Sequence, residues 1–494
     1  MKLTKFLCLA LALLMTIACF VACGGNGADT TLPKANGGDQ DETGRNAVKD
    51  TVPTDLNFKG EVMTFFVRDD NEMWKNEMDV EKTTNDTLYD SIYYRNATVE
   101  ERLGVEITQI GQAGSFSVSD SWNTTLRNAV LTKSGDYDAA AIYASTGSAL
   151  AVEGLYYNVL DLPYLNLNQP WWNQTIRDEL TLFDTLYYLG GDIVVTEIAN
   201  GLCLFFNKDL FNELYQSQNI NLYDVVNQGK WTIDYMGQLV AGAWIDENSD
   251  GIISDGDTVG YTNNATSTSD GGMDAWIPAM GIKLTTIIDG YPELTFYDEH
   301  TVEAFEKLKE LHISNPGTLC MGGLSQTKFS VGNQLFMRST LDAGSSLRDM
   351  QDDYGVLPLP KFDEEQADYH TTFANTASLV VVLSTCTDTD KVGATLELMA
   401  AEAYKQVTPA YFEICLQGKY SDAPEDAEMY DRILKTFVFN FGFCYSTKSL
   451  DGVGSLFRDL TKDIAQTYES NKIKYEASLE TLIDKLDEVS FMMG

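Results

Sequence analysis

Runs of apolar residues along the chain alternate between strand-like and helix-like patterns. Residues 60–67, GEVMTFFV, are rich in β-type side chains and predict a strand. Apolar residues then recur at helical spacing between 88 and 103, and LGVEITQI, residues 103–110, predicts a second strand. A further helical stretch leads to a buried type of strand at 138–143. The order strand, helix, strand, helix, strand is typical of an α/β fold.

The same pattern returns further along the chain. Strand-like runs lie within 185–211 and within 354–385, and residues 456–486 predict one or two amphipathic helices. The sequence contains no internal repeat, no GxGxxG, no Walker loop and no GxSxG. About 440 residues follow the N-terminal region, which exceeds the size at which a single core stops growing. We therefore expect two or more domains.

The N-terminus has the pattern of an export signal. Lys2 and Lys5 precede an apolar run at 6–22 that is too short for a comfortable membrane span and has no stop-transfer charges after it. FVAC followed by GG resembles the lipobox of bacterial lipoproteins, in which the cysteine is diacylated. We expect a signal peptide at 1–22, a lipid on Cys23, with Cys19 as the second candidate, and a location on the extracellular face of the cell membrane.

Residues 23–57 differ in composition from the rest of the chain. They are rich in glycine and polar side chains and have no hydrophobic period, so they cannot bury enough surface to offset the entropy of ordering. We expect a flexible linker that tethers the body to the lipid.

Charge and cysteine content exclude several classes. The chain has 34 basic and 73 acidic residues, a net charge of -39, and no basic cluster that could follow a phosphate backbone. Nucleic acid is excluded as a partner, and the acyl group is the expected membrane contact. Five cysteines follow the linker at wide spacings, which fits neither a disulfide scaffold nor a CxxC metal site. Whether one pair forms a disulfide is left open.

Several short motifs occur in a specific order: FFNKDLF, GKWTIDYM, a DxNxDG loop ending in VGY, DYGVLPLPK, and VTPAYFEICLQGKYSDAPEDAEMYDRI. Together they resemble the extracellular solute-binding proteins of bacterial ABC importers, in particular the sugar-binding group that includes maltose-binding protein. The resemblance implies a two-lobed periplasmic-binding-protein-like α/β fold of type II, in which each lobe is a mixed sheet flanked by helices. It also implies a small-molecule ligand, expected to be a sugar, held between the lobes, and the permease subunits of an ABC transporter as partners. We expect a monomer.

The resemblance also implies where the chain crosses between lobes. The crossings are expected near 190–197, 370–378 and 437–445. Lobe one would comprise 58–190 and 378–436, and lobe two 191–377 and 437–494.

The stretch DENSDGIISDGD matches the spacing of a twelve-residue calcium loop, with Gly251 at the sharp turn. A strand-like TVGY follows it instead of a second helix, so a bound Ca²⁺ would be structural and not a sensor. The alternative is a solvated acidic turn without metal. The expected ligands are Asp246, Asn248, Asp250, the carbonyl of Ile252, and Asp257.

A sugar cleft needs aromatic walls with a few polar groups. Trp171 and Trp172 are adjacent, so at most one faces the cleft; Trp172 is the candidate, with core packing as the alternative. Trp276 matches the family segment that lends an aromatic ring to the wall of lobe two. Asn200 lies eight residues before Lys208, where the maltose-binding pattern has a glutamate in the cleft, and this change leaves the ligand's identity open.

Polar candidates follow strands whose ends should face the cleft. Tyr143 and Ser145 end the strand at 138–143, and Arg68 and Asp69 end the first strand. Arg338 lies in a segment expected to line the cleft. The alternative for each is an ordinary surface or interlobe contact.

Two other function classes remain open. A secreted carbohydrate-active enzyme needs only two well-spaced carboxylates, which 73 acidic residues do not exclude, but the histidines have no zinc spacing and no serine or cysteine has a nucleophile context. A structural surface lipoprotein would explain the tether but not two matched lobes. We expect a binding protein and not an enzyme, with a peptide or another solute as the alternative to sugar.

Overall fold

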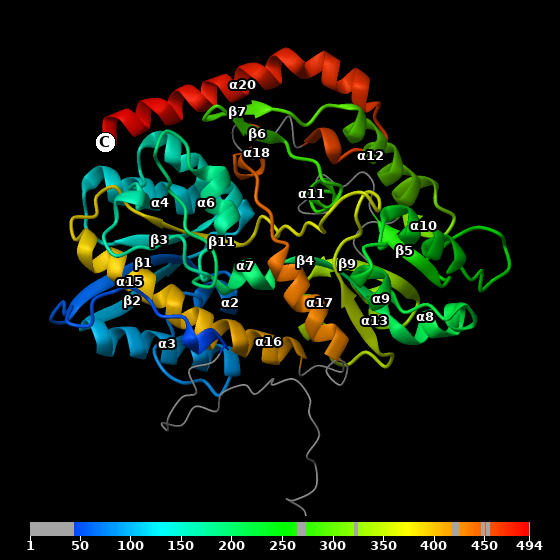
Figure 1. Cartoon of the computed structure of the whole chain (residues 1–494), viewed down its shortest axis with the longest axis horizontal. Helices are drawn as coiled ribbons and strands as arrows, with labels where there is room; N and C mark the ends of the chain where they lie inside the picture. Colours follow the sequence, from blue (N-terminus) through cyan, green and yellow to red (C-terminus); the bar gives the residue numbers. More distant parts are fainter. Residues whose placement is uncertain are drawn as a thin grey trace, which may run out of the picture. The chain divides into compact units, whose positions relative to one another are not determined.

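The computed structural model describes residues 44–263, 273–320, 325–416, 424–445, 450 and 455–493 (Figure 1). A first mixed sheet has the strand order β11-β3-β1-β2. β1 pairs in parallel with β2 and β3, and β11 is antiparallel to β3 with Ser378 opposite Tyr143. The strands are β1 (Glu61–Arg68), β2 (Val105–Gln112), β3 (Ala139–Tyr143) and β11 (Ser378–Val382).

Helices cover both faces of this sheet (Figure 1). On α3 the residues predicted at helical spacing, including Ile92 and Val99, are buried. Asp86 caps this helix by accepting from the backbone N–H groups of Leu88 and Tyr89, and Gly104 ends it in a left-handed conformation. The helices are α3 (Thr87–Leu103), α4 (Ser119–Thr132), α6 (Gln174–Leu180), α15 (Thr389–Glu402) and α16 (Thr408–Leu416), with the short α2 (Glu72–Lys75) and α5 (Ala144–Gly147).

A second mixed sheet has the order β10-β4-β9-β5-β8. β4 is antiparallel to β10 and β9, and β5 is parallel to β9 and β8. The strands are β4 (Leu202–Asn207), β5 (Val259–Asn263), β8 (Thr318–Cys320), β9 (Gln334–Thr340) and β10 (Tyr354–Leu357). Two mixed sheets flanked by helices confirm the α/β class.

The helices of the second region pack around this sheet (Figure 1). They are α8 (Lys208–Tyr215), α9 (Leu222–Asn227), α10 (Ile233–Gly242), α11 (Trp276–Ala279), α12 (Glu299–Lys309), α13 (Ser325–Ser330) and α14 (Ala343–Ser346). The short α7 (Val195–Ala199) instead contacts β11, and its Ile198 packs in a cluster with Ile92 of α3. α17 (Pro424–Lys435) packs against β10, and its Asp426 pairs with Lys208 at 2.8 Å. α17 therefore lies on the second sheet, whereas lobe one was expected to include all of 378–436. The other lobe boundaries stay a prediction.

The segments that connect the two sheets run side by side. Gly201 forms an isolated antiparallel bridge with Phe373, and Thr371 forms a parallel bridge with Phe437. The backbone N–H of Leu202 donates to the carbonyl of Thr372 at 2.9 Å. Residues near 201, near 372 and near 437 are therefore joined by backbone hydrogen bonds between the sheets.

The linker prediction is wrong for residues 44–57, which pack on the body. Arg102 of α3 donates two hydrogen bonds of 2.8 and 2.7 Å to the carboxylate of Asp50, and Val52 is 4% exposed. Arg45 lies over the ring of Tyr404 at 4.2 Å. The polar composition of this segment gave no sign of the packing, because a few charged contacts and one buried valine are enough to hold it on the body.

Of the one or two helices expected at 456–486, the structure shows one long helix with later bounds, α20 (Ile464–Met493). One face of α20 is buried, with Leu479, Leu482 and Leu486 in the core. It contacts the hairpin of β6 (Thr285–Ile288) and β7 (Tyr291–Leu294), α12, and the 3-10 helix η3 (Ser148–Glu153). Within the described part of the chain, no helix is long and apolar enough to span a membrane.

Candidate functional site

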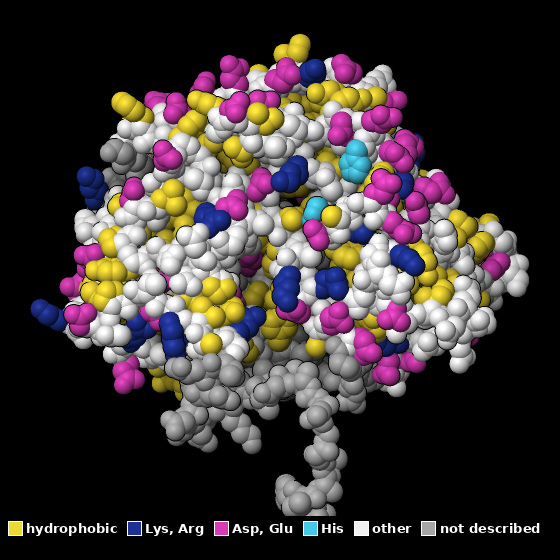
Figure 2. Space-filling model, viewed as in Figure 1, with side chains coloured by type: hydrophobic (Ala, Val, Ile, Leu, Met, Phe, Trp, Pro, Cys, Tyr) yellow, Lys and Arg dark blue, Asp and Glu magenta, His cyan; other side chains and the backbone are white. Residues whose placement is uncertain are grey.

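A cavity of about 230 Å³ lies where the connecting segments meet. Its wall comes from the end of β3, the start of β4, the segment around α11, and the segments at 370–375 and 438–444. Figure 2 shows a hollow near the middle of the viewed face, with basic and histidine side chains beside it. Because the lining comes from both sheets and from the segments between them, a bound molecule would contact both halves of the fold.

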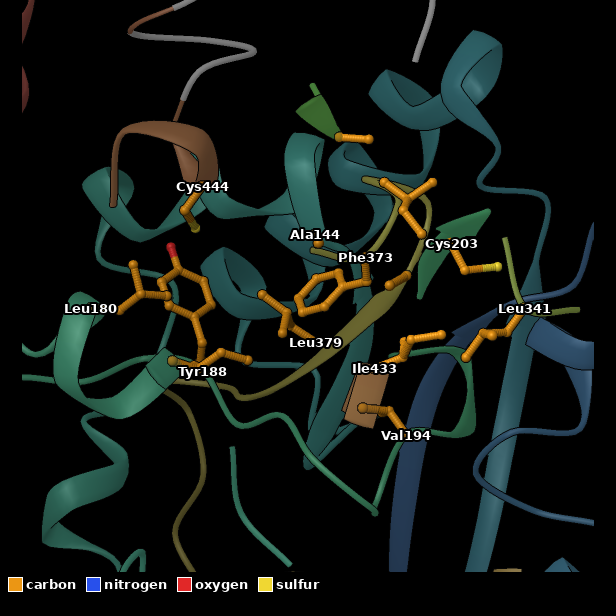
Figure 3. Packing of buried hydrophobic residues seen from close by; sticks show 14 of the residues in the cluster. Ala144, Leu180, Tyr188, Val194, Cys203, Leu341, Phe373, Leu379, Ile433 and Cys444 are labelled. Carbon is orange, nitrogen blue, oxygen red and sulfur yellow. The ribbon is translucent and has the colours of Figure 1, made fainter. Parts of the chain in front are cut away.

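Aromatic and aliphatic side chains make up much of the wall. Phe373 and Phe439 stack with ring centroids 5.3 Å apart and an interplanar angle of 29°. Phe443 and Ile282 also line the cavity. In Figure 3, Phe373 lies beside Ala144, the residue that follows β3. Flat apolar surfaces of this kind suit the C–H faces of sugar rings.

The charged groups on the wall are paired. Arg458 donates to both carboxylate oxygens of Asp274 at 3.0 and 3.1 Å, and Lys283 pairs with Glu179 at 2.9 Å. Burial lowers the pKa of His370, whose Nδ1 lies 3.0 Å from the carbonyl oxygen of Pro278. The wall is therefore polar in places but close to neutral, which suits a neutral, hydroxyl-rich ligand better than an ion.

Uncharged polar side chains add hydrogen-bonding capacity. Asn375 lines the cavity and accepts a hydrogen bond of 3.3 Å from the hydroxyl of Tyr143. Asn440 donates to the carbonyl of Thr285 at 2.8 Å. Ser145 also lines the cavity, and its buried hydroxyl has no partner among the described residues. An unpaired buried hydroxyl is costly unless a ligand or water meets it.

Three of the predicted polar residues gather at or beside this cavity. Ser145 is on its wall and Tyr143 bonds to a wall residue. Asn200 accepts from the backbone N–H of Ala374 at 2.8 Å and, through its side chain, from the hydroxyl of Thr376 at 3.4 Å. Their roles in ligand binding stay predictions.

Arg68 lies deeper, at the end of β1, and is 1% exposed. Its Nη2 donates to the carbonyl of Thr376 at 2.9 Å and to the hydroxyl of Ser378 at 2.8 Å. Its guanidinium lies over the rings of Trp74 and Tyr143, at 4.1 and 4.9 Å from their centroids. Burial lowers the pKa of Arg68 to about 10. Arg68 therefore ties the end of β1 to Thr376 and to Ser378 at the start of β11, and its role in ligand binding stays a prediction.

The remaining polar candidates lie away from the cavity wall. Asp69, next to Arg68, is exposed. Arg338 is half-buried in β9, opposite Leu204 of β4. Together with burial, the charge of Arg338 lowers the pKa of His312 to about 3, so that imidazole is neutral.

Neither candidate tryptophan lines the cavity, and for Trp172 the structure shows the alternative, core packing. Trp172 is 4% exposed, and its indole Nε1 donates to Glu397 of α15 at 2.9 Å. Trp276 is fully buried, edge-on to His312 at 5.0 Å. Trp171 is buried as well. Both adjacent rings are covered by the rest of the protein. Alternation of side chains along the extended segment at 171–172 therefore does not bring either ring to the surface.

The aromatic wall and its amides come from residues that the sequence pattern did not single out: Phe373, Phe439, Phe443, Asn375 and Asn440. They lie inside the crossings expected at 370–378 and 437–445, so the positions of those crossings were the available signal. The crossings run between the two sheets, so their side chains either contact one another or face the space between the lobes.

The acidic loop at 246–257 satisfies much of its own hydrogen bonding. Asp246 accepts from the backbone N–H groups of Asp250 and Gly251 at 3.1 and 2.7 Å. Asp257 is buried and accepts from the backbone N–H groups of Glu247 and Ser254 at 3.2 and 2.8 Å. Among the described residues, no three His, Cys, Asp or Glu side chains come together closely enough to hold a metal. The hydrogen bonds of Asp246 and Asp257 order the loop, and Ca²⁺ binding by it stays a prediction.

Residues 1–43, which include the expected signal peptide, Cys19 and Cys23, lie outside the described residues. Cys203, Cys320, Cys386 and Cys444 form no disulfide.

Comparison by sequence gives no match, either with protein-family models or with curated proteins. Comparison by structure gives many. A cyclo/maltodextrin-binding protein in complex with maltotetraose is 13% identical, with a TM-score of 0.54 over 87% of this chain and 97% of the other. UspC of M. tuberculosis is 15% identical, with a TM-score of 0.54 over 84% of this chain and 100% of the other.

A third similar structure is the galacto-N-biose-/lacto-N-biose I-binding protein of a Bifidobacterium longum ABC transporter, in complex with lacto-N-biose. It is 12% identical, with a TM-score of 0.53 over 88% of this chain and 98% of the other. The maltodextrin- and lacto-N-biose-binding proteins are binding proteins rather than enzymes. At these identities the likeness shows the fold, and it confirms the two-lobed architecture of the maltose-binding group.

Proposed function

We propose that this chain, which has the two-lobed fold of ABC sugar-binding proteins, captures a small carbohydrate between its lobes and delivers it to an ABC importer. The observation that carries the proposal is the cavity between the two sheets, with the stacked pair Phe373 and Phe439 on its wall. Stacked rings beside amides and neutralised charges suit a ligand with both C–H faces and hydroxyl groups.

Charge pairing on the wall argues for binding without catalysis. A glycosidase needs two carboxyl groups that flank a scissile bond. On this wall the carboxylate of Asp274 is held by Arg458, and Glu179, beside the wall, is held by Lys283. Turnover of chromogenic glycosides would instead favour the enzyme class. Failure to bind any small molecule would favour a structural surface lipoprotein.

We further propose that Cys23 carries a lipid that keeps the body on the extracellular face of the membrane. The support is the FVAC motif before GG. Metabolic labelling with a fatty-acid analogue should mark the wild type and not the Cys23→Ser variant. Equal labelling of both would overturn this assignment and point to Cys19.

The ligand is best identified with a body that lacks the anchor. Because residues 44–57 pack on α3, the protein to express is 44–494 and not a shorter one beginning at 58. Mass spectrometry of what co-purifies, followed by calorimetry with that molecule, tests the proposal. A saccharide in stoichiometric amount supports it, whereas a co-purifying peptide or other solute would replace sugar as the ligand class.

A further inference from the structure

The hairpin β6–β7, residues 285–294, belongs to neither large sheet. It follows directly on Gly281, Ile282 and Lys283, which line the cavity. In Figure 1 the hairpin lies beneath α20, between the regions of the two sheets. Through residues 281–283 the hairpin is continuous with the cavity wall.

The hairpin and its preceding lysine reach the first half of the fold. Lys283 pairs with Glu179 of α6 at 2.9 Å. Tyr291 of β7 lies edge-to-face with Phe183, with ring centroids 5.5 Å apart. Phe183 and Glu179 both precede the first crossing, whereas Lys283 and Tyr291 belong to the second region of the chain. We call these two contacts the clasp.

The hairpin is held firmly at its base. The backbone N–H and hydroxyl of Thr285 donate to Oδ1 of Asn440 at 3.3 and 3.2 Å, and the backbone N–H of Gly442 donates to the hydroxyl of Thr285 at 2.9 Å. α20 packs on β7 from the other side. A fixed base and a hairpin supported by α20 mean that opening the clasp does not require unfolding the hairpin.

The clasp contacts are exposed enough to be reversible. The side chain of Lys283 is 57% exposed and Tyr291 is 54% exposed. The Glu179 side chain is 16% exposed, so solvent reaches the ion pair from the Lys283 side. Ion pairs that water can reach contribute little to stability, so the clasp can open for a ligand and close again. While it is closed, it bridges the two halves at one end of the cavity.

The volume of the cavity fits a short ligand. The cavity measures about 230 Å³, below the roughly 300–1,000 Å³ usual for sites that hold drug-sized molecules. We propose that the clasp closes one end of the cavity and restricts the ligand to a neutral saccharide of one or two rings, excluding longer oligosaccharides. This inference rests on the proposed function.

The test compares saccharides of increasing length. Residues 44–494 are titrated by calorimetry with glucose-series and galactose-series saccharides of one to four rings. Two variants are measured beside the wild type: the double variant Glu179→Gln, Tyr291→Ala, which breaks the clasp, and Ile473→Ala on the outer face of α20, where the side chain is 82% exposed. Thermal unfolding checks that each variant is folded.

We expect the wild type to bind its best one- or two-ring saccharide at least tenfold more tightly than the matching four-ring compound. The clasp variant should reduce that ratio at least fivefold, and Ile473→Ala should keep it. A wild type that binds four rings as tightly as two overturns this inference and leaves the proposed function standing. An unchanged ratio in the clasp variant also overturns it. Absence of binding to every saccharide overturns both.

Discussion

The indole Nε1 of Trp172 donates a hydrogen bond of 2.9 Å to Oε2 of Glu397, joining the segment before the first crossing to α15. Trp172 is therefore part of the interior of the first region. We predict that Trp172→Ala lowers the free energy of unfolding by about 3–5 kcal/mol, because a large buried side chain leaves a cavity. Saccharide affinity of the folded protein should stay as in the wild type.

Denaturant unfolding and calorimetry together check this prediction. Trp172→Phe is the matched control, since it keeps most of the packing and removes only the hydrogen bond. A Trp172→Ala protein that is as stable as the wild type but does not bind saccharide would show that Trp172 contacts the ligand.

Glu397 gives the protein a pH-dependent stability. Burial raises the pKa of this carboxyl from 4.5 to about 7, although the N–H groups of Asn166 and Trp172 lower it in part. Between these two values the folded state binds more protons than the unfolded state, so stability falls as the pH rises through that window. Below the unfolded pKa both states are protonated, so stability no longer changes with pH and the contribution of Glu397 is fully present.

Glu397→Gln should therefore reduce the fall in melting temperature between pH 5 and pH 7. The amide oxygen can still accept from Trp172, and the amide nitrogen carries no charge to bury. Burial also raises the pKa of Glu197 to about 7. The Glu397→Gln variant should therefore keep part of the decrease of melting temperature with pH. The exposed Glu101→Gln serves as the control. Parallel curves for Glu397→Gln and wild type would contradict the prediction.

The paired hydrogen bonds from Arg102 to Asp50 hold the N-terminal segment of the body. We predict that Arg102→Met lowers the free energy of unfolding by about 1–3 kcal/mol, because it also leaves the largely buried Asp50 carboxylate unpaired. Limited proteolysis should cut within 44–57 faster in this variant. Lys435→Met removes an exposed pair with Asp431 and should change little. Equal effects of the two substitutions would argue against a specific role for Asp50.

The acidic loop offers a test of metal binding. If Ca²⁺ occupies the loop, binding to the folded state alone raises stability, by about 2.7 kcal/mol when the ion is at 100 times its dissociation constant. Chelation should then lower the melting temperature of the wild type and not that of Asp246→Ala, Asp250→Ala. A wild type that melts identically in Ca²⁺ and in chelator would favour the metal-free turn, held by the hydrogen bonds of Asp246 and Asp257 alone.

The spacing of apolar residues predicted much of the fold, because a helix or strand that buries one face repeats apolar residues at a regular interval. The buried face of α3 and the strand that becomes β3 follow from spacing alone. The positions of Trp172 and Trp276 do not, because a sequence does not reveal that both faces of a segment are covered. Nothing in the sequence indicated that Phe373 and Phe439 stack, because the two residues lie far apart along the chain and meet only when it is folded.

Calorimetric titration of residues 44–494 with saccharides, with and without Phe439→Ala, tests the central claim most directly. Phe439 is half-buried on the cavity wall, so its ring is available to a ligand. We predict that the wild type binds at least one saccharide with one-to-one stoichiometry, and that Phe439→Ala stays folded and binds it at least tenfold more weakly, a loss of about 1.4 kcal/mol. A wild type that binds no saccharide, or a folded Phe439→Ala with undiminished affinity, would contradict carbohydrate capture in this cavity.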